Sequence, residues 1–255
     1  MTLLHAALLG IIEGATEFLP ISSTGHLILA GEVLGIPSTD FYKSFQIIIQ
    51  LGAILAVVAL YFRTLLDIEI IKRVAIAFVP TGLIGLALYG IVKTYLLGST
   101  VVVMWSLLIG GLIFILYELS HPESFKADRR VTDITYLQAF LVGLCQAVAI
   151  VPGVSRSGAT ILGGLFLGIP RKTIVEFSFL LAVPTMAAAT GFDIFKNYSS
   201  FTAEGVGALA VGFIMSFLTA ILAIRFLLHF VRTHSFIPFG IYRILLAGIV
   251  FLFLL

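Results

Sequence analysis

Charged side chains are scarce in this chain of 255 residues: they account for 11% of it, whereas hydrophobic residues account for 60%. Soluble domains usually carry about 25% charged residues, so the composition predicts an integral membrane protein. The formal net charge of +2 is too small to indicate a nucleic-acid partner. Because Cys145 is the only cysteine, the chain excludes an internal disulfide framework.

Long apolar runs predict six transmembrane helices, since about 20 residues are needed to cross the hydrocarbon core of a bilayer. The expected spans are residues 45–62, 74–92, 101–117, 173–192, 206–228 and 236–255. Pro80 and Pro184 fall within two of these spans, and we expect a kink at each of them.

Two further apolar regions, residues 3–35 and 137–168, are each interrupted midway by a proline and a polar cluster. As a helix, residues 3–19 would rise roughly 25 Å, which falls short of about 30 Å of hydrocarbon. Each region is therefore predicted to form a re-entrant hairpin with its polar break at membrane depth. Irregular backbone is tolerated there only where protein or a wet cavity surrounds it.

The two hairpin regions resemble each other in sequence. At a shift of 133 positions (141 minus 8), LLGIIEGATEFLPISSTGHLILAGEVLGIP aligns with LVGLCQAVAIVPGVSRSGATILGGLFLGIP. Shared apolar composition does not explain the matches of Gly, Ser and Pro, such as Ser22 with Ser155. We infer an internal duplication, with a first repeat at residues 1–130 and a second repeat at residues 131–255.

Each repeat would contain one hairpin and three spans, so an odd number of crossings places the second copy upside down. The predicted fold class is an all-α integral membrane protein, with six transmembrane helices and two re-entrant helical hairpins in an inverted-topology repeat. In secondary transporters, broken elements of this kind meet near the midplane of the membrane and mark the binding site.

Basic residues indicate the orientation, because they concentrate on the cytoplasmic side of a membrane protein. Under this topology one face carries many more of them and is expected to be cytoplasmic, so both termini and the mouth of the first hairpin face outside. The polar link at residues 121–130 is expected to be a solvated connector. The richer face would hold Arg63, Lys72, Arg73, Lys126, Arg129, Arg130, Arg171, Lys172, Arg225 and Arg232, and the other face Lys43, Lys93 and Lys196.

Glu13 and Glu17 are four residues apart, so on a helix they share one face and their carboxylates repel each other. Burial in a membrane raises that cost, and a divalent cation, a proton or an arginine is expected to accompany them. Oxygen ligands favour Mg²⁺ or Ca²⁺ over zinc. The alternative is a water-exposed helix end at the outer surface.

The first polar cluster supplies Ser22, Ser23, Thr24 and His26 where a second helix is expected to begin. The hydroxyls could be ordinary helix N-caps, or they could bind a ligand. His26 lies three residues after Ser23, within reach of it as a base or an orienting group.

The second cluster places Arg156 at the position that corresponds to Ser23. An arginine at membrane depth needs an anion, and one alternative is a structural ion cluster with the two glutamates. Otherwise amides at a helix start, hydroxyls and a guanidinium together form a phosphate site. The other expected phosphate-binding residues of this cluster are Gly153, Ser155, Ser157, Gly158 and Thr160.

The motifs EGATEFLPISSTGH and PGVSRSGAT, with FSFLLAVP and PFGIYR later in the chain, resemble the undecaprenyl-diphosphate phosphatases of the bacterial bacitracin-resistance family. The resemblance covers nearly the whole chain. The family signature, a Glu/Gln-xxx-Glu pair followed later by PGxSRSxxT, is met by Glu13, Glu17 and residues 152–160.

The resemblance implies hydrolysis of undecaprenyl diphosphate to the monophosphate carrier of cell-wall precursors, which gives bacitracin resistance. It also implies a divalent ion and a bacterial plasma-membrane location with the site facing outside, where the partners are the polyprenyl lipid and the bilayer. We favour Ser23 as the nucleophile and His26 as its base, with Glu17 and Arg156 also catalytic. The alternative gives His26 the role of nucleophile or of base for water, with Ser23 only binding phosphate.

Architecture alone also permits a lipid-phosphate flippase or an ion-coupled transporter, because inverted repeats with broken helices serve alternating access. A structural or assembly subunit is a third alternative. Arg156 and the serine–histidine set favour chemistry, since transport alone needs no nucleophile. The sequence leaves the oligomeric state open, and a homodimer is one expectation.

Overall fold

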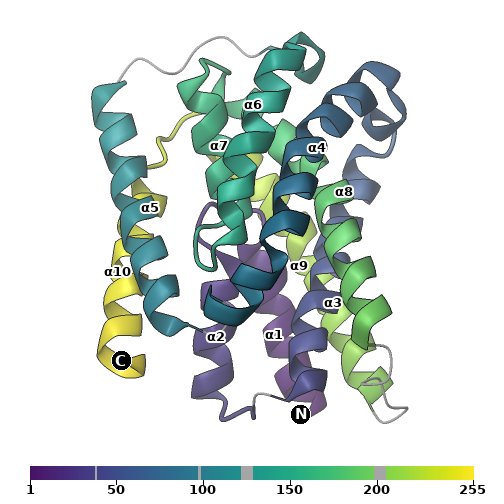
Figure 1. Ribbon diagram of the computed structural model, residues 1–255, viewed down its shortest axis with the longest axis vertical. Coiled ribbons are helices and arrows are strands. Elements are labelled where there is room, and N and C mark those ends of the chain that lie inside the picture. Colours follow the sequence, from purple (N-terminus) through teal and green to yellow (C-terminus); the bar gives the residue numbers. More distant parts are fainter. Residues whose placement is uncertain (38, 97–98, 122–128, 198–204) are drawn as a thin grey trace.

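The computed structural model describes residues 1–255 except 38, 97–98, 122–128 and 198–204 (Figure 1). Every regular element in the described part of the chain is helical. The long helices are α3 (Asp40–Tyr61), α4 (Ile68–Ile91), α5 (Thr100–Ser120), α8 (Arg171–Asn197), α9 (Val206–Phe230) and α10 (Ile237–Leu254). The shorter ones are α1 (Leu3–Thr16), α2 (Ser23–Val33), α6 (Tyr136–Ala147) and α7 (Arg156–Phe166), with single turns at Thr64–Leu66, Val92–Leu96, Val131–Asp133 and Val148–Ile150.

The six long helices match the six predicted spans, and each is long and apolar enough to cross a membrane. The boundaries differ by a few residues: α4 begins at Ile68, where the side chain of Asp67 accepts a hydrogen bond from the Glu69 N–H. Pro80 and Pro184 lie inside continuous helices, and the predicted kinks stay predictions. The helices indicate a multi-pass membrane protein.

Two pairs of short helices occupy the regions for which hairpins were predicted. In Figure 1, α1 and α2 extend into the bundle from the end that carries both termini, and α6 and α7 extend into it from the opposite end. The irregular segments between the paired helices, which we name the first break (residues 17–22) and the second break (residues 148–155), meet near the middle of the bundle. Each break contains a proline, which lacks the N–H that a continuing helix would need.

The second helix of each pair begins with the same backbone geometry. Ser22 has φ 70° and ψ 94°, and Ser155 has φ 74° and ψ 115°. A positive φ is uncommon for a residue with a side chain, and such strain is concentrated at functional sites. Each serine Oγ accepts a hydrogen bond from the backbone N–H three residues later, at Gly25 and Gly158 respectively.

The helices of the two sequence halves pack reciprocally: α1 lies along α9, and α6 lies along α4. Glycines permit the close approach, because a Cβ on Gly10 would run into the carbonyl oxygen of Gly212, and one on Gly143 would run into that of Ala77. The third long helices of the two halves, α5 and α10, pack on each other.

Arg171, one of the basic residues assigned to the cytoplasmic face, lies buried beside Glu118 at the start of α8. Nη1 of Arg171 donates to Oε1 of Glu118 at 2.6 Å, and Nη2 pairs with Oε2. The Phe236 N–H donates to the same Oε1 at 3.0 Å. This ion pair joins α5 and α8 to the start of α10. Most of the predicted polar link, residues 122–128, lies outside the described residues.

Candidate active site

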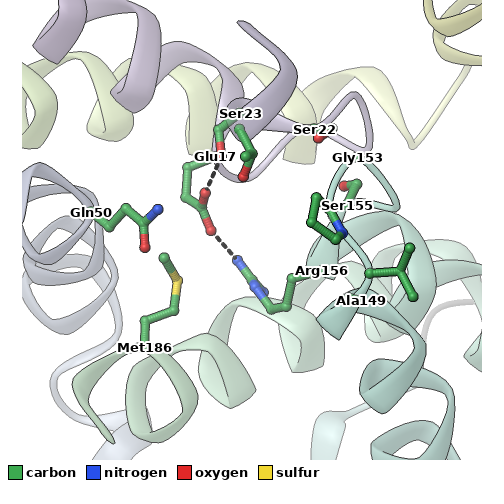
Figure 2. A pocket seen from close by; sticks show the side chains of 12 residues that line it. Glu17, Ser22, Ser23, Gln50, Ala149, Gly153, Ser155, Arg156 and Met186 are labelled. Atoms are coloured by element: carbon green, nitrogen blue, oxygen red, sulfur yellow. Dashed lines mark hydrogen bonds and ion pairs between the residues drawn. The ribbon is translucent and has the colours of Figure 1, made fainter. Parts of the chain in front are cut away.

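A cavity of about 160 Å³ lies where the two breaks meet (Figure 2). The first break and the start of α2 form one wall, the second break and the start of α7 form another, and α3 and α8 contribute one side chain each. Its lining includes seven predicted site residues, which are Glu17, Ser22, Ser23, Thr24, Gly153, Ser155 and Arg156. The structure therefore brings together polar clusters that are 133 positions apart in the sequence.

A chain of polar contacts crosses this cavity from one break to the other (Figure 2). Ser23 Oγ donates to Oε2 of Glu17 at 2.6 Å, and Nη2 of Arg156 donates to Oε1 of Glu17 at 3.2 Å. Ser23 and Glu17 are only 6% and 7% exposed, so little water competes with these contacts. The carboxylate is thus placed to take the serine proton while the guanidinium holds it in position.

Arg156 is held on its other side by α8. Its Nη1 donates to the carbonyl oxygen of Ser178 at 2.8 Å and to the hydroxyl of the same residue at 3.3 Å. Its Nε is buried and has no hydrogen-bond partner within the described chain. The Nη contacts thus fix the guanidinium between Glu17 and Ser178.

The remaining predicted residues of the second cluster support the site from behind it. Ser157 donates to the Leu19 carbonyl at 2.8 Å, which ties α7 to the first break. Thr160 Oγ1 lies 2.6 Å from Ser178 Oγ, and so links α7 to the residue that holds Arg156. Gly158 donates its N–H to the Ser155 cap. None of these three residues lines the cavity, and their direct contact with phosphate stays a prediction.

His26 was expected to reach Ser23, and the structure turns its ring in another direction. Nδ1 lies 2.8 Å from the Ser22 carbonyl oxygen and Nε2 lies 2.7 Å from Oη of Tyr242 on α10. Because a carbonyl oxygen only accepts, Nδ1 carries the hydrogen, and in the neutral ring Nε2 accepts from Tyr242. Among the hydrogen bonds of the described residues, the partner of the Ser23 hydroxyl is Glu17 and not His26.

Glu13 lies one helical turn before Glu17 and is 0% exposed. Its carboxyl group lies against that of Glu17, and two carboxyls form a hydrogen bond only when they share a proton. A cation can take the place of that proton, and Mg²⁺ is usually bound by one or two carboxylates together with substrate phosphates. The described part of the chain has no cluster of three His, Cys, Asp or Glu side chains for a cation held entirely by protein.

Comparison with known proteins matches residues 6–249 to the family model described as bacitracin resistance protein BacA. The chain belongs to this family. It is 53% identical over 252 residues to the undecaprenyl-diphosphatase of Sulfurihydrogenibium sp., with 99% of each chain covered. It is 51% identical to the undecaprenyl-diphosphatases of Aquifex aeolicus, covering 97% of this chain and 96% of the relative, and of Persephonella marina, covering 100% of both.

The BacA-family resemblance expected from the motifs is confirmed, but some residues around the cavity had not been singled out. Gln50 of α3 and Met186 of α8 also line it (Figure 2). Arg243 of α10 is fully buried against both breaks. An isolated glutamine or arginine in an apolar run was the available signal, yet the sequence does not indicate what such a side chain faces.

Proposed function

We propose that this protein hydrolyses undecaprenyl diphosphate to undecaprenyl phosphate and inorganic phosphate. The observation that carries the proposal is the contact chain Ser23–Glu17–Arg156, which combines a hydroxyl, a proton acceptor and a phosphate-binding group in one cavity. BacA-family membership and the undecaprenyl-diphosphatases that match nearly the whole chain support the substrate. Release of phosphate recycles the lipid carrier for cell-wall synthesis and accounts for bacitracin resistance.

In the proposed reaction Ser23 Oγ attacks the terminal phosphorus. A bond forms between Oγ and phosphorus, the bond from phosphorus to the bridging oxygen breaks, and undecaprenyl phosphate leaves. Glu17 accepts the hydroxyl proton, because its Oε2 already accepts the hydrogen bond from Ser23. A water molecule then attacks the phosphoserine, which releases inorganic phosphate and regenerates the Ser23 hydroxyl.

Arg156 would stabilise the negative charge that spreads over the oxygens of the transferred phosphoryl group. Its guanidinium is held by Glu17 on one side and by Ser178 on the other, so it is oriented before the substrate arrives. A preorganised donor of this kind costs little reorganisation during the reaction. Arg156 lines the cavity, which supports this role.

We further propose that Glu13 and Glu17 hold a divalent cation, Mg²⁺ or Ca²⁺. The buried Glu13 carboxyl lies against that of Glu17, and a cation between the two would offset their repulsion, which supports this assignment. A bound cation would supply Lewis-acid neutralisation of the diphosphate charge. Of the two carboxylates, Glu17 alone lines the cavity, so its loss is expected to be the more damaging one.

The role of His26 in this proposal is to position the first break, and Glu17 replaces it as the base for Ser23. Its two ring nitrogens are engaged by the Ser22 carbonyl and by Tyr242, which supports the change. The alternative keeps His26 as nucleophile or as base for water, and it requires the ring to leave Tyr242 during turnover.

We infer that the two short-helix pairs are re-entrant hairpins of an inverted repeat, with domains at residues 1–130 and 131–255. The matched positive φ angles of Ser22 and Ser155 and the reciprocal packing of α1 with α9 and α6 with α4 support the inference. By the distribution of basic residues, the end that carries both termini faces outside the bacterial plasma membrane. Assembly as a homodimer stays a prediction.

Phosphate release from the purified protein in detergent, with undecaprenyl diphosphate as substrate, tests the proposed function. We expect turnover that depends on Mg²⁺ or Ca²⁺ and that is lost in Ser23→Ala. Movement of the intact diphosphate across proteoliposomes without phosphate release would instead support the transporter. If the protein neither releases phosphate nor moves the lipid, the remaining alternative is a structural subunit.

A further inference from the structure

Arg243 of α10 is buried to 0% exposure near the middle of the bundle, at the junction of the two breaks. A guanidinium has five N–H donors, and this one makes five hydrogen bonds, all of them to backbone carbonyl oxygens. The acceptors are Pro20 at 3.3 Å, Gly153 at 3.2 Å, Val154 at 2.9 Å, Ser106 at 2.8 Å and Leu107 at 3.3 Å.

These acceptors belong to three separate parts of the fold. Pro20 lies in the first break, Gly153 and Val154 lie in the second break, and the other two acceptors lie on α5. The peptides that Arg243 holds are next to the reacting groups: Pro20 is three residues from both Glu17 and Ser23, and Val154 is two residues before Arg156. One side chain therefore fixes the backbone of both cavity walls relative to each other and to α5.

Two features set Arg243 apart from an ordinary buried ion pair. Within the described chain it makes no salt bridge, so its charge is balanced by carbonyl dipoles rather than by a carboxylate. The fold also makes room for its head group, because a Cβ on Gly110 of α5 would run into Nη2 of Arg243. A charge at membrane depth is costly, and ionisable residues retained there are usually functional.

We propose that Arg243 is a positioning residue for the phosphate cavity, which sets the spacing of the two breaks without touching the substrate. The proposal rests on the proposed phosphatase function. If Arg243 is replaced, Glu17 and Ser23 on one wall and Arg156 on the other shift relative to each other. A displacement of about 1 Å in a catalytic site can lower the rate roughly 100-fold, so the effect should appear mainly in kcat.

The test compares two substitutions that disturb this contact from opposite sides. Arg243→Lys keeps the charge but offers three donors for five carbonyls. Gly110→Ala keeps the arginine and displaces its head group. We expect each to lower kcat at least tenfold on a short polyprenyl diphosphate in detergent, with KM changed less than threefold. In the double variant, Gly110→Ala should add little to Arg243→Lys, because both act through one head group.

Arg171→Lys is the matched control, since Arg171 is also a buried arginine that links α5, α8 and α10, but it pairs with Glu118 and not with the carbonyls of the two breaks. It should lower the thermal unfolding temperature while kcat stays within threefold of wild type. The proposal is overturned if Gly110→Ala and Arg243→Lys both keep the wild-type kcat, or if Arg171→Lys loses as much kcat as they do. It is also overturned if the losses of kcat in the two single variants multiply in the double variant. Inactive wild-type protein would instead refute the proposed function.

Discussion

The two breaks share a backbone but carry different side chains. Both place a serine at positive φ before a helix, Ser22 in the first and Ser155 in the second, and both cap that helix in the same way. The residue that follows the capping serine is Ser23 in the first break and Arg156 in the second. One break thus presents the proposed nucleophile, and the other presents the arginine proposed to bind its phosphate.

The helices that precede the breaks diverge in the same manner. Gln146 of α6 occupies the position that corresponds to Glu13, and its Nε2 donates to Thr81 Oγ1 at 2.9 Å and to Thr185 Oγ1 at 3.1 Å. The neighbour of the Glu13 carboxyl is the carboxyl of Glu17 instead. The second region therefore keeps a polar contact to two hydroxyl groups, while the first keeps a pair of adjacent carboxyls. The two breaks share a backbone geometry, and the residues that differ between them divide the proposed chemistry.

Replacing Ser23 should have the largest effect on turnover. We expect Ser23→Ala to lower kcat by about 10³-fold or more, because the step that forms the phosphoserine is lost while substrate binding remains. Steady-state phosphate release with the lipid diphosphate measures it, and Ser120→Ala, in a serine at the end of α5, should behave as wild type. Near-normal turnover in Ser23→Ala together with loss in His26→Ala would transfer the nucleophile or base role to His26 or water.

Replacing Glu17 should come next, with a fall in kcat of about 10²- to 10⁴-fold in Glu17→Gln, the range for loss of a general base. Glu13→Gln should be milder, since Glu13 does not line the cavity. Titration of activity with Mg²⁺ and with Ca²⁺ separates the two roles, and both variants should need more cation than wild type. Metal curves identical to wild type in both would remove the carboxylates from cation binding.

Arg156→Lys should lower kcat/KM roughly 100-fold, comparable to the loss of one preorganised donor. Lysine keeps the charge but cannot contact Glu17, Ser178 and a phosphate at the same time with the geometry of a guanidinium. Arg73→Lys provides the control, because Arg73 pairs with Glu69 in the first turns of α4 and does not line the cavity. Equal kinetics in both lysine variants would mean that Arg156 is only a structural charge.

The smallest of these effects should follow removal of the Tyr242 hydroxyl. Tyr242→Phe deletes one hydrogen bond to His26, worth about 1 kcal/mol, so we expect kcat to fall no more than about fivefold. If the His26 ring only positions the first break, His26→Ala should lower kcat only modestly more than Tyr242→Phe does. Measurement of kcat for both variants and for the double variant is sufficient, and a loss above about 10³-fold in His26→Ala would show that the imidazole takes part in the chemistry.

Much of this arrangement could be predicted from the sequence. Apolar length located the six long helices, and the proline and serine matches between residues 8–37 and 141–170 located the two breaks. The need of a buried arginine for an anion linked Arg156 to Glu17, and the structure places that pair 3.2 Å apart. These predictions succeeded because the length of an apolar run and the position of a proline determine helix boundaries locally. A buried charge, in turn, has a free-energy cost that few arrangements of the helices can offset.

The contacts of His26 and Arg243 could not be predicted in the same way. Spacing of three residues placed His26 near Ser23, but the direction of a ring depends on packing, and here it is set by Tyr242, which is 216 positions away in the sequence. Arg243 is bound by backbone carbonyls, and carbonyls leave no pattern in a sequence because every residue has one. Contacts of these kinds become visible only once the helices are placed in space.

A double-mutant cycle between the two breaks tests most directly whether they form one catalytic site. We would measure kcat/KM for Glu17→Gln, Arg156→Lys and the double variant, with Arg73→Lys in the Glu17→Gln background as the uncoupled control. Contacting residues usually couple by about 0.5–3 kcal/mol, so the loss caused by Arg156→Lys should shrink at least threefold when Glu17 is already replaced. Losses that multiply, as those of the control should, would contradict a shared site.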